Sequence, residues 1–200
     1  MKRLPFLTLL LGALAVSIHC SSAVETALQF DRMALVHGEI WRLFTGHFTH
    51  FGGDHLRWDV IAFLAFGSLV EIRSRTGFVV CLGVSCLAIT LGVALFQPQF
   101  AIYRGLSGVD SAMFGFVSAD LLRSGRRERD RVMFGLGALA LAGFAGKSVF
   151  ELATGSTLFV ATHSVFQAVP LAHLIGAITG AVCVWATRSR PVELTVSAAT

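Results

Sequence analysis

The sequence predicts an all-α membrane protein, a bundle of six transmembrane helices with both termini in the cytoplasm. Hydrophobic residues make up 54% of the 200 positions and charged residues only 14%, whereas soluble domains are about one quarter charged. The apolar residues gather in stretches of about 20, the length that crosses the hydrocarbon core of a bilayer. This composition excludes a soluble domain, a disordered tail protein, a secreted disulfide scaffold and a nucleic-acid-binding protein.

The first predicted span covers residues 4–24. It carries no charged side chain and follows the basic start Met1-Lys2-Arg3. A basic start before an apolar stretch is also typical of a signal peptide. We favour a retained helix, because the stretch is long enough to span a bilayer and no small-x-small cleavage site ends it. Residues 25–54 are mixed in polarity, which indicates an excursion along the membrane surface.

The second and third spans are bounded by charge and by a turn. The second covers residues 55–71 and ends in the charged run 71–75. The third covers residues 77–97 and ends at the turn Gln97-Pro98-Gln99. Both stretches fit the length of a transmembrane helix.

Arginine-rich runs bound the remaining spans. The fourth covers residues 107–122 and stops at the run 123–131. The fifth covers residues 132–150, and the sixth covers residues 165–187 before Arg188-Ser189-Arg190. We therefore expect one transmembrane domain over residues 1–200.

The positions of the basic residues predict the orientation of these spans. If the N-terminus is cytoplasmic, the loops on that side hold 11 of the 16 basic residues, namely Lys2, Arg3, Arg73, Arg75, Arg123, Arg126, Arg127, Arg129, Arg131, Arg188 and Arg190. Cytoplasmic loops carry the excess of Lys and Arg in membrane proteins. Both termini are therefore expected in the cytoplasm.

A serine flanked by glycines opens the fourth span, in the run Gly105-Leu106-Ser107-Gly108. Glycines leave a hydroxyl group unshielded, and the N–H groups of a helix start can stabilise a developing oxyanion. Both features suit a serine nucleophile. A serine that merely packs between helices is the alternative.

A histidine in the sixth span lies on a face of small residues. His173, Gly176 and Gly180 are spaced as neighbours on one side of a helix, and such a face allows close packing on a partner helix. The fourth span has a matching face that includes Ser107. If the two faces meet, His173 can act as the general base for Ser107; otherwise it bonds to a neighbouring helix backbone.

Further polar residues enter the second span as His50-x4-His55-x3-Asp59. These side chains could donate hydrogen bonds to an oxyanion, bind a metal, or satisfy each other. We expect no metal, because no H-E-x-x-H motif is present. We expect no cofactor either, since the four cysteines lie in apolar stretches without metal-site spacing.

Together these residues resemble the rhomboid intramembrane serine proteases. Four motifs occur in the order of that family: Trp41-Arg42, His50-x4-His55-x3-Asp59, Gly105-Leu106-Ser107-Gly108 and Ala172-His173-x2-Gly176-x3-Gly180. The resemblance implies a Ser107–His173 dyad, an oxyanion site made by His55 and the Ser107 N–H, and a structural role for Trp41-Arg42. It also implies a multi-pass protein of the bacterial inner membrane that cleaves membrane-anchored substrates near the periplasmic face.

Two positions depart from the pattern of the family. Asp59 stands where the family usually has asparagine, and an ionised aspartate cannot donate a hydrogen bond. Asp59 is therefore either protonated, or it orients His55. An aromatic residue usually follows the serine by four positions, whereas this chain has Asp110-Ser111. We expect Asp110 or Ser111 to orient the catalytic histidine instead.

Within the family the chain is most similar to the rhombosortases, through the runs 38–47 and 103–108. That resemblance implies the processing of C-terminal Gly-Gly anchor signals. Two other hypotheses stay open. One is a catalytically inactive rhomboid-like protein that binds transmembrane helices, and the other is a metal or haem protein that uses His50, His55 and His173.

Overall fold

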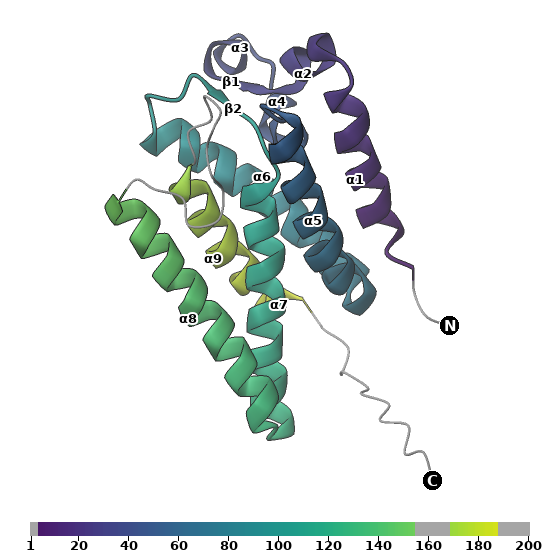
Figure 1. Cartoon of the computed structure of the whole chain (residues 1–200), viewed down its shortest axis with the longest axis vertical. Coiled ribbons are helices and arrows are strands. Elements are labelled where there is room, and N and C mark those ends of the chain that lie inside the picture. The colour runs from purple at the N-terminus through teal and green to yellow at the C-terminus, as the bar shows by residue number, and fades with distance from the viewer. Residues whose placement is uncertain (1–3, 155–168, 188–200) are drawn as a thin grey trace.

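The computed structural model describes residues 4–154 and 169–187, most of which are helical. The long helices are α1 (Phe6–His19), α5 (Gly53–Arg73), α6 (Arg75–Phe96), α7 (Ser107–Glu128), α8 (Arg131–Thr154) and α9 (Pro170–Ala186). The short elements are α2 (Ser22–Leu28), β1 (Phe30–Asp31), α3 (Arg32–Val36), α4 (Arg42–Thr45), the 3₁₀ turn η1 (Gly46–Phe48) and β2 (Ile102–Tyr103). Figure 1 shows the long helices side by side, with the short elements gathered at one end.

Helices occupy all six predicted stretches, with one difference at the first. The chain bends by 117° between α1 and α2, so the stretch 4–24 is not one straight helix. The break has a local cause: Ser21 is extended, and its hydroxyl accepts a hydrogen bond from the N–H of Val24, which starts α2 in a new direction. Residues 165–168 of the sixth stretch lie outside the described residues.

Length and composition single out fewer spans than the six predicted. In the described part of the chain, α6 and residues 131–151 of α8 are long and apolar enough to cross a membrane, and α1 with α2 would be a third, broken span. Helix α9 is apolar but shorter, with 17 residues. The count of six crossings therefore stays a prediction.

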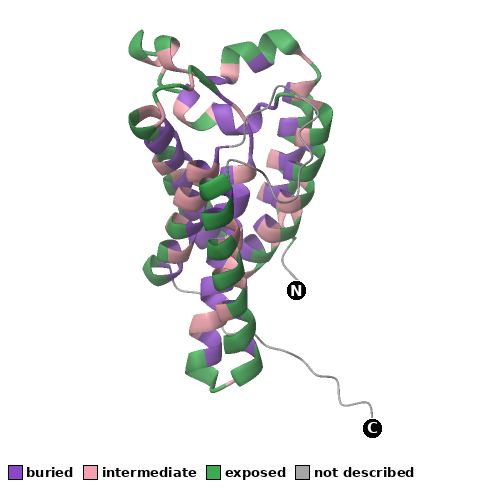
Figure 2. Ribbon diagram, turned by 60° about the vertical axis from the view of Figure 1, so that its left-hand side comes forward, coloured by how far each residue is buried: buried purple, intermediate pink, exposed green. Residues whose placement is uncertain are grey.

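Apolar side chains cover much of the outer surface of the bundle. Figure 2 shows buried residues along the inner faces of the helices and exposed residues facing outward. On α8 the outward residues include Val132, Leu136 and Leu139, and only 17% of its most apolar stretch is buried. Such a surface is unfavourable in water but suits contact with lipid.

Helix α7 is the centre of the bundle and packs against α5, α6, α8 and α9. Its closest partner is α9, and glycines make that approach possible. A Cβ at Gly176 would collide with the carbonyl of Gly108, and a Cβ at Gly180 would collide with the carbonyl of Ala112. Gly115 likewise lies against the backbone of Ala177. The small-residue face expected on α9 therefore packs on α7, through Gly108, Ala112 and Gly115 of that helix.

The short elements fasten the chain that leads into α7. Strands β1 and β2 pair in antiparallel register, with Phe30 opposite Tyr103. The guanidinium of Arg32 donates hydrogen bonds to the carbonyls of Ala94 at 2.6 Å and Gln97 at 3.1 Å. A cation at the C-terminal end of α6 satisfies free carbonyls of that helix. The turn between α6 and β2 is therefore held by Arg32 and by the pairing of β1 with β2.

At the other end of the bundle, a buried carboxylate closes the start of α1. Glu71 accepts hydrogen bonds from the backbone N–H groups of Leu7 at 3.1 Å and Thr8 at 2.8 Å, and from the Thr8 hydroxyl at 2.9 Å. An acidic side chain at a helix N-terminus satisfies its free donors. This contact ties α1 to α5.

We predict that Gly180→Ala destabilises the protein. The added methyl group collides with the Ala112 carbonyl, and such overpacking costs about 1–3 kcal/mol of unfolding free energy. Gly135→Ala is the matched control, because open space surrounds that position on α8. Thermal unfolding in detergent micelles measures both variants. A melting temperature of Gly180→Ala equal to that of Gly135→Ala would contradict the close contact.

Candidate active site

The site is built on the first turns of two neighbouring helices. Ser107 is the first residue of α7, and His173 lies in the first turn of α9. The Nε2 atom of His173 is 3.1 Å from the Oγ atom of Ser107, which is hydrogen-bond distance for a base and a nucleophile. The structure thus brings together the two residues that the sequence analysis paired.

Gly105 makes room for His55 beside Ser107. It adopts φ +125°, a left-handed conformation that favours glycine, and a Cβ there would lie 2.8 Å from His55 Nε2. Of the expected packing glycines, Gly105 therefore serves the loop, whereas Gly108, Gly176 and Gly180 serve the α7–α9 contact. Any side chain at position 105 would push His55 away from the serine.

The carboxylate of Asp59 holds the start of α7. Its Oδ2 atom accepts hydrogen bonds from the backbone N–H groups of Leu106 at 2.8 Å and Ser107 at 3.2 Å. The same oxygen lies 3.2 Å from Nε2 of His50 and 3.2 Å from Nε2 of His55. The two groups expected to form the oxyanion site, His55 and the Ser107 N–H, are thus both directed at Asp59.

This geometry bears on the two hypotheses for Asp59. Four nitrogens converge on one carboxylate oxygen, an arrangement that suits an acceptor and fits the hypothesis that Asp59 orients His55. His50, which lies between η1 and α5, joins the cluster as well. Burial lowers the pKa of His50, while its contact with Asp59 acts in the opposite direction.

A second buried histidine has a structural task. The Nε2–H group of His47 donates hydrogen bonds to the carbonyl of Cys86 at 3.1 Å and to the hydroxyl oxygen of Thr90 at 3.0 Å. Burial lowers the pKa of His47 to about 4, so the ring is neutral at physiological pH. His47 therefore fastens η1 to α6.

Asp110 and Ser111 are not brought to the histidine ring in the way expected. The hydroxyl of Ser111 donates to the carbonyl of Ser107 at 2.8 Å, and among the described residues Asp110 Oδ1 has no hydrogen-bond partner. Both residues line a cavity of about 770 Å³ between α5, α7 and α8. Its other walls are mostly apolar and include Phe66, Phe114, Phe144 and Phe150.

The carboxylate that does approach His173 belongs to a residue the sequence analysis missed. Glu151 Oε2 on α8 is 3.8 Å from His173 Nδ1 and 2.7 Å from Lys147 Nζ. Its side chain is only 3% exposed. An ionisable pair four residues apart at the end of the predicted span 132–150 could have revealed it, since such residues mark functional positions in membranes.

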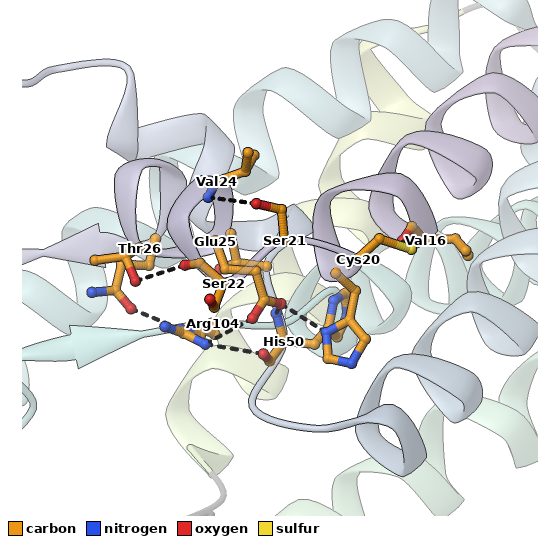
Figure 3. Close-up of polar contacts among 12 residues, drawn as sticks. Val16, Cys20, Ser21, Ser22, Val24, Glu25, Thr26, His50 and Arg104 are labelled. Carbon is orange, nitrogen blue, oxygen red and sulfur yellow. Dashed lines mark hydrogen bonds and ion pairs between the residues drawn. The ribbon is translucent and has the colours of Figure 1, made fainter.

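A polar network apart from Ser107 and His173 supports the loop before Ser107. Figure 3 shows the carboxylate of Glu25 between Arg104 and His50. Glu25 accepts from the His50 N–H at 3.0 Å and from Arg104 at 3.2 Å, while Arg104 also donates to the His50 carbonyl at 3.1 Å and to Gln29 at 2.7 Å. The network joins α2 to the loop that carries His50 and to the loop that carries Arg104.

The Trp41-Arg42 motif makes structural contacts. Arg42 donates hydrogen bonds to the carbonyls of Thr26 at 2.9 Å and Gln29 at 2.7 Å, and it pairs with Glu39 at 2.7 Å. These contacts fasten α4 beneath α2.

For the metal hypothesis, no group of three or more His, Cys, Asp or Glu residues within residues 4–154 and 169–187 is arranged to hold a metal ion.

Comparison with known proteins places the chain in a family. The family profile described as the Rhomboid domain matches residues 37–190, a region that contains Asp59, Ser107, Glu151 and His173. Among curated proteins, none matches the chain significantly. The matched region covers well over half of the chain and ends beyond α9. The chain therefore belongs to the rhomboid family of intramembrane serine proteases, and it is a multi-pass membrane protein.

Proposed function

We propose that this chain is an active intramembrane serine endopeptidase with Ser107 as nucleophile and His173 as general base. One observation carries the proposal: Ser107 Oγ lies 3.1 Å from His173 Nε2, at the N-terminus of α7. A nucleophile and a base within hydrogen-bond distance are the core of serine hydrolase chemistry. The free N–H groups of the helix start favour negative charge beside the hydroxyl.

The reaction follows from this geometry in two halves. Ser107 Oγ attacks the carbonyl carbon of the substrate while His173 Nε2 takes the hydroxyl proton. His173 then gives that proton to the leaving amine nitrogen, the C–N bond breaks, and an ester on Ser107 remains. A water molecule that loses its proton to His173 attacks the ester, which releases the carboxylic acid and restores Ser107.

The groups that bind the Asp59 carboxylate would form the oxyanion site. Its Oδ2 atom accepts from the N–H groups of Leu106 and Ser107, and such converging donors also stabilise the negative oxygen of a tetrahedral intermediate. The oxyanion would take over the Ser107 N–H from Asp59. His55, held at 3.2 Å by Asp59, would be the side-chain donor.

We propose six membrane crossings, with the site near the periplasmic face of a bacterial inner membrane. The corner between α5 and α6 and the corner between α7 and α8 carry most of the basic residues described, and both lie away from the end with the short elements (Figure 1). Basic residues prefer the cytoplasmic side, so Ser107 would face the periplasm. A substrate anchored in the bilayer would reach it there.

The cavity supports an apolar substrate segment. It adjoins the site through Ser111 and Lys147, and its phenylalanine walls favour apolar side chains. As the substrate class we propose membrane-anchored proteins, and among them those with a C-terminal Gly-Gly signal ahead of an anchor helix, as in the rhombosortases. The alternative is an inactive rhomboid-like protein that binds transmembrane helices, which the occupied Ser107 N–H favours.

We predict that a serine-reactive fluorophosphonate labels the wild-type protein in membranes. Labelling should be lost in Ser107→Ala, which lacks the nucleophile, and should fall by about 10³-fold or more in His173→Ala, which lacks the base. In-gel fluorescence at equal protein amounts measures both. Ser111→Ala is the control, because that hydroxyl bonds to a backbone carbonyl. Labelling of wild type no stronger than of Ser107→Ala would support the inactive alternative.

We predict that Asp59→Leu slows labelling by about 100-fold, because the donors around Ser107 and the His55 ring lose their acceptor. Asp59→Asn keeps an acceptor oxygen and should stay within about tenfold of wild type. Time courses of labelling at matched melting temperatures give the two rates. An Asp59→Leu variant that reacts as fast as wild type would remove Asp59 from the mechanism.

We predict cleavage of a reporter that carries a C-terminal Gly-Gly motif, an apolar helix and a basic tail. Co-expression with wild type should release the shortened reporter from the membrane, and Ser107→Ala should leave it at full length. Immunoblots of membrane and soluble fractions measure this. A reporter with Gly-Gly replaced by Leu-Leu is the control. Equal reporter size with both enzymes would count against this substrate class and leave the dyad untouched.

A further inference from the structure

A carboxylate lies on the opposite side of the His173 ring from Ser107. Glu151 Oε2 is 3.8 Å from His173 Nδ1, while Nε2 of the same ring is 3.1 Å from Ser107 Oγ. We propose that Glu151 is a positioning residue, which holds His173 through Nδ1 in the orientation that accepts the Ser107 proton. The proposal rests on the proposed protease function and adds a third group to its dyad.

The chemistry of the imidazole ring explains why such a group is needed. To accept a proton at Nε2, the neutral ring must carry its own proton on Nδ1. Among the described residues Nδ1 is buried without a hydrogen-bond partner, and Glu151 is the carboxylate that faces it. A carboxylate there selects the right tautomer, and it stabilises the imidazolium that forms when Ser107 gives up its proton.

The distance is compatible with this task. At 3.8 Å the two atoms are farther apart than in a hydrogen bond, but catalytic hydrogen bonds are often long in an unliganded enzyme and tighten with substrate. The Glu151 side chain is 3% exposed, so water competes little for the carboxylate.

Lys147 holds the carboxylate in place. Its Nζ atom lies 2.7 Å from the same Oε2 atom, one helical turn away on α8. A buried carboxylate is stable only with such a partner. Because Lys147 shares the oxygen, Glu151 should act more weakly than the carboxylate of a complete triad, whose replacement by its amide costs about 10⁴-fold in rate.

The residues around the ring strengthen the case. Ser111 stands where many rhomboid proteases carry an aromatic side chain under the histidine, and its hydroxyl bonds to the Ser107 carbonyl instead. Position 111 of α7 therefore offers no aromatic ring to pack on the histidine. Glu151 approaches from α8, which means that a third helix takes part in orienting His173.

A purely structural reading is that Glu151 and Lys147 only neutralise each other within α8. The two readings differ in one respect. Glu151→Gln and Lys147→Met both break the ion pair, but only Glu151→Gln removes the carboxylate from His173. Under our proposal Glu151→Gln slows the chemistry more than Lys147→Met, whereas under the structural reading the two variants behave alike.

The test measures fluorophosphonate labelling of the full-length protein in detergent at several probe concentrations. We expect Glu151→Gln to lower the maximal labelling rate by about 10- to 100-fold, with the probe concentration for half-maximal rate unchanged. Glu71→Gln is the matched control, since Glu71 is equally buried but binds the start of α1. Melting temperatures of all variants show whether each is folded.

The outcomes separate the two proposals. A selective loss of the maximal rate in Glu151→Gln, with Glu71→Gln and wild type alike, supports the positioning role. If wild type and Glu151→Gln react equally fast, or if Lys147→Met loses as much rate as Glu151→Gln, the role of Glu151 is refuted while the dyad stands. If wild type is not labelled at all, the proposed function fails, and the role of Glu151 fails with it.

Discussion

The close contact between α7 and α9 is the constraint on which the site depends. Ser107 and His173 lie on different helices, and their 3.1 Å distance exists only because the two backbones nearly touch. Glycine at positions 176 and 180 allows this, since any Cβ there would collide with carbonyls of α7. In a bilayer no hydrophobic effect drives helices together, so van der Waals contact between small residues must do so. The packing surface and the reacting pair are therefore one structural unit.

The buried carboxylates near the site need partners, because the site lies inside a bundle of low dielectric constant. Three of the buried carboxylates around the site have a cationic or imidazole partner: Glu25 with Arg104, Asp59 with His50 and His55, and Glu151 with Lys147. Each carboxylate also contacts a different part of the site, namely the loop before Ser107, the Ser107 N–H and the His173 ring. Buried charges persist only when paired, and the pairs hold backbone and ring in fixed positions.

Sequence patterns predicted the parts of this arrangement that depend on spacing within a single helix. His173, Gly176 and Gly180 share a face by helical periodicity alone, and the apolar stretches located the helices. Contacts between elements distant in sequence could not be read in the same way. Glu151 reaches His173 because α8 packs beside α9, and Asp59 reaches the Ser107 N–H because α5 packs beside α7. The 117° bend after α1 occurs at the capping residue Ser21, inside a stretch without charged side chains that gave no sign of a break.

The position of Asp59 links stability to reactivity at this site. In the resting structure its carboxylate accepts the N–H groups of Leu106 and Ser107, which would otherwise be free donors at a helix start. An unsatisfied buried donor costs about 1–3 kcal/mol, so the acceptor stabilises the turn when no substrate is present. In the proposed mechanism the substrate oxyanion takes the Ser107 N–H from Asp59, so this donor faces a negatively charged acceptor both before and during the reaction. If the site works as proposed, Asp59 keeps its backbone donors in place between turnovers.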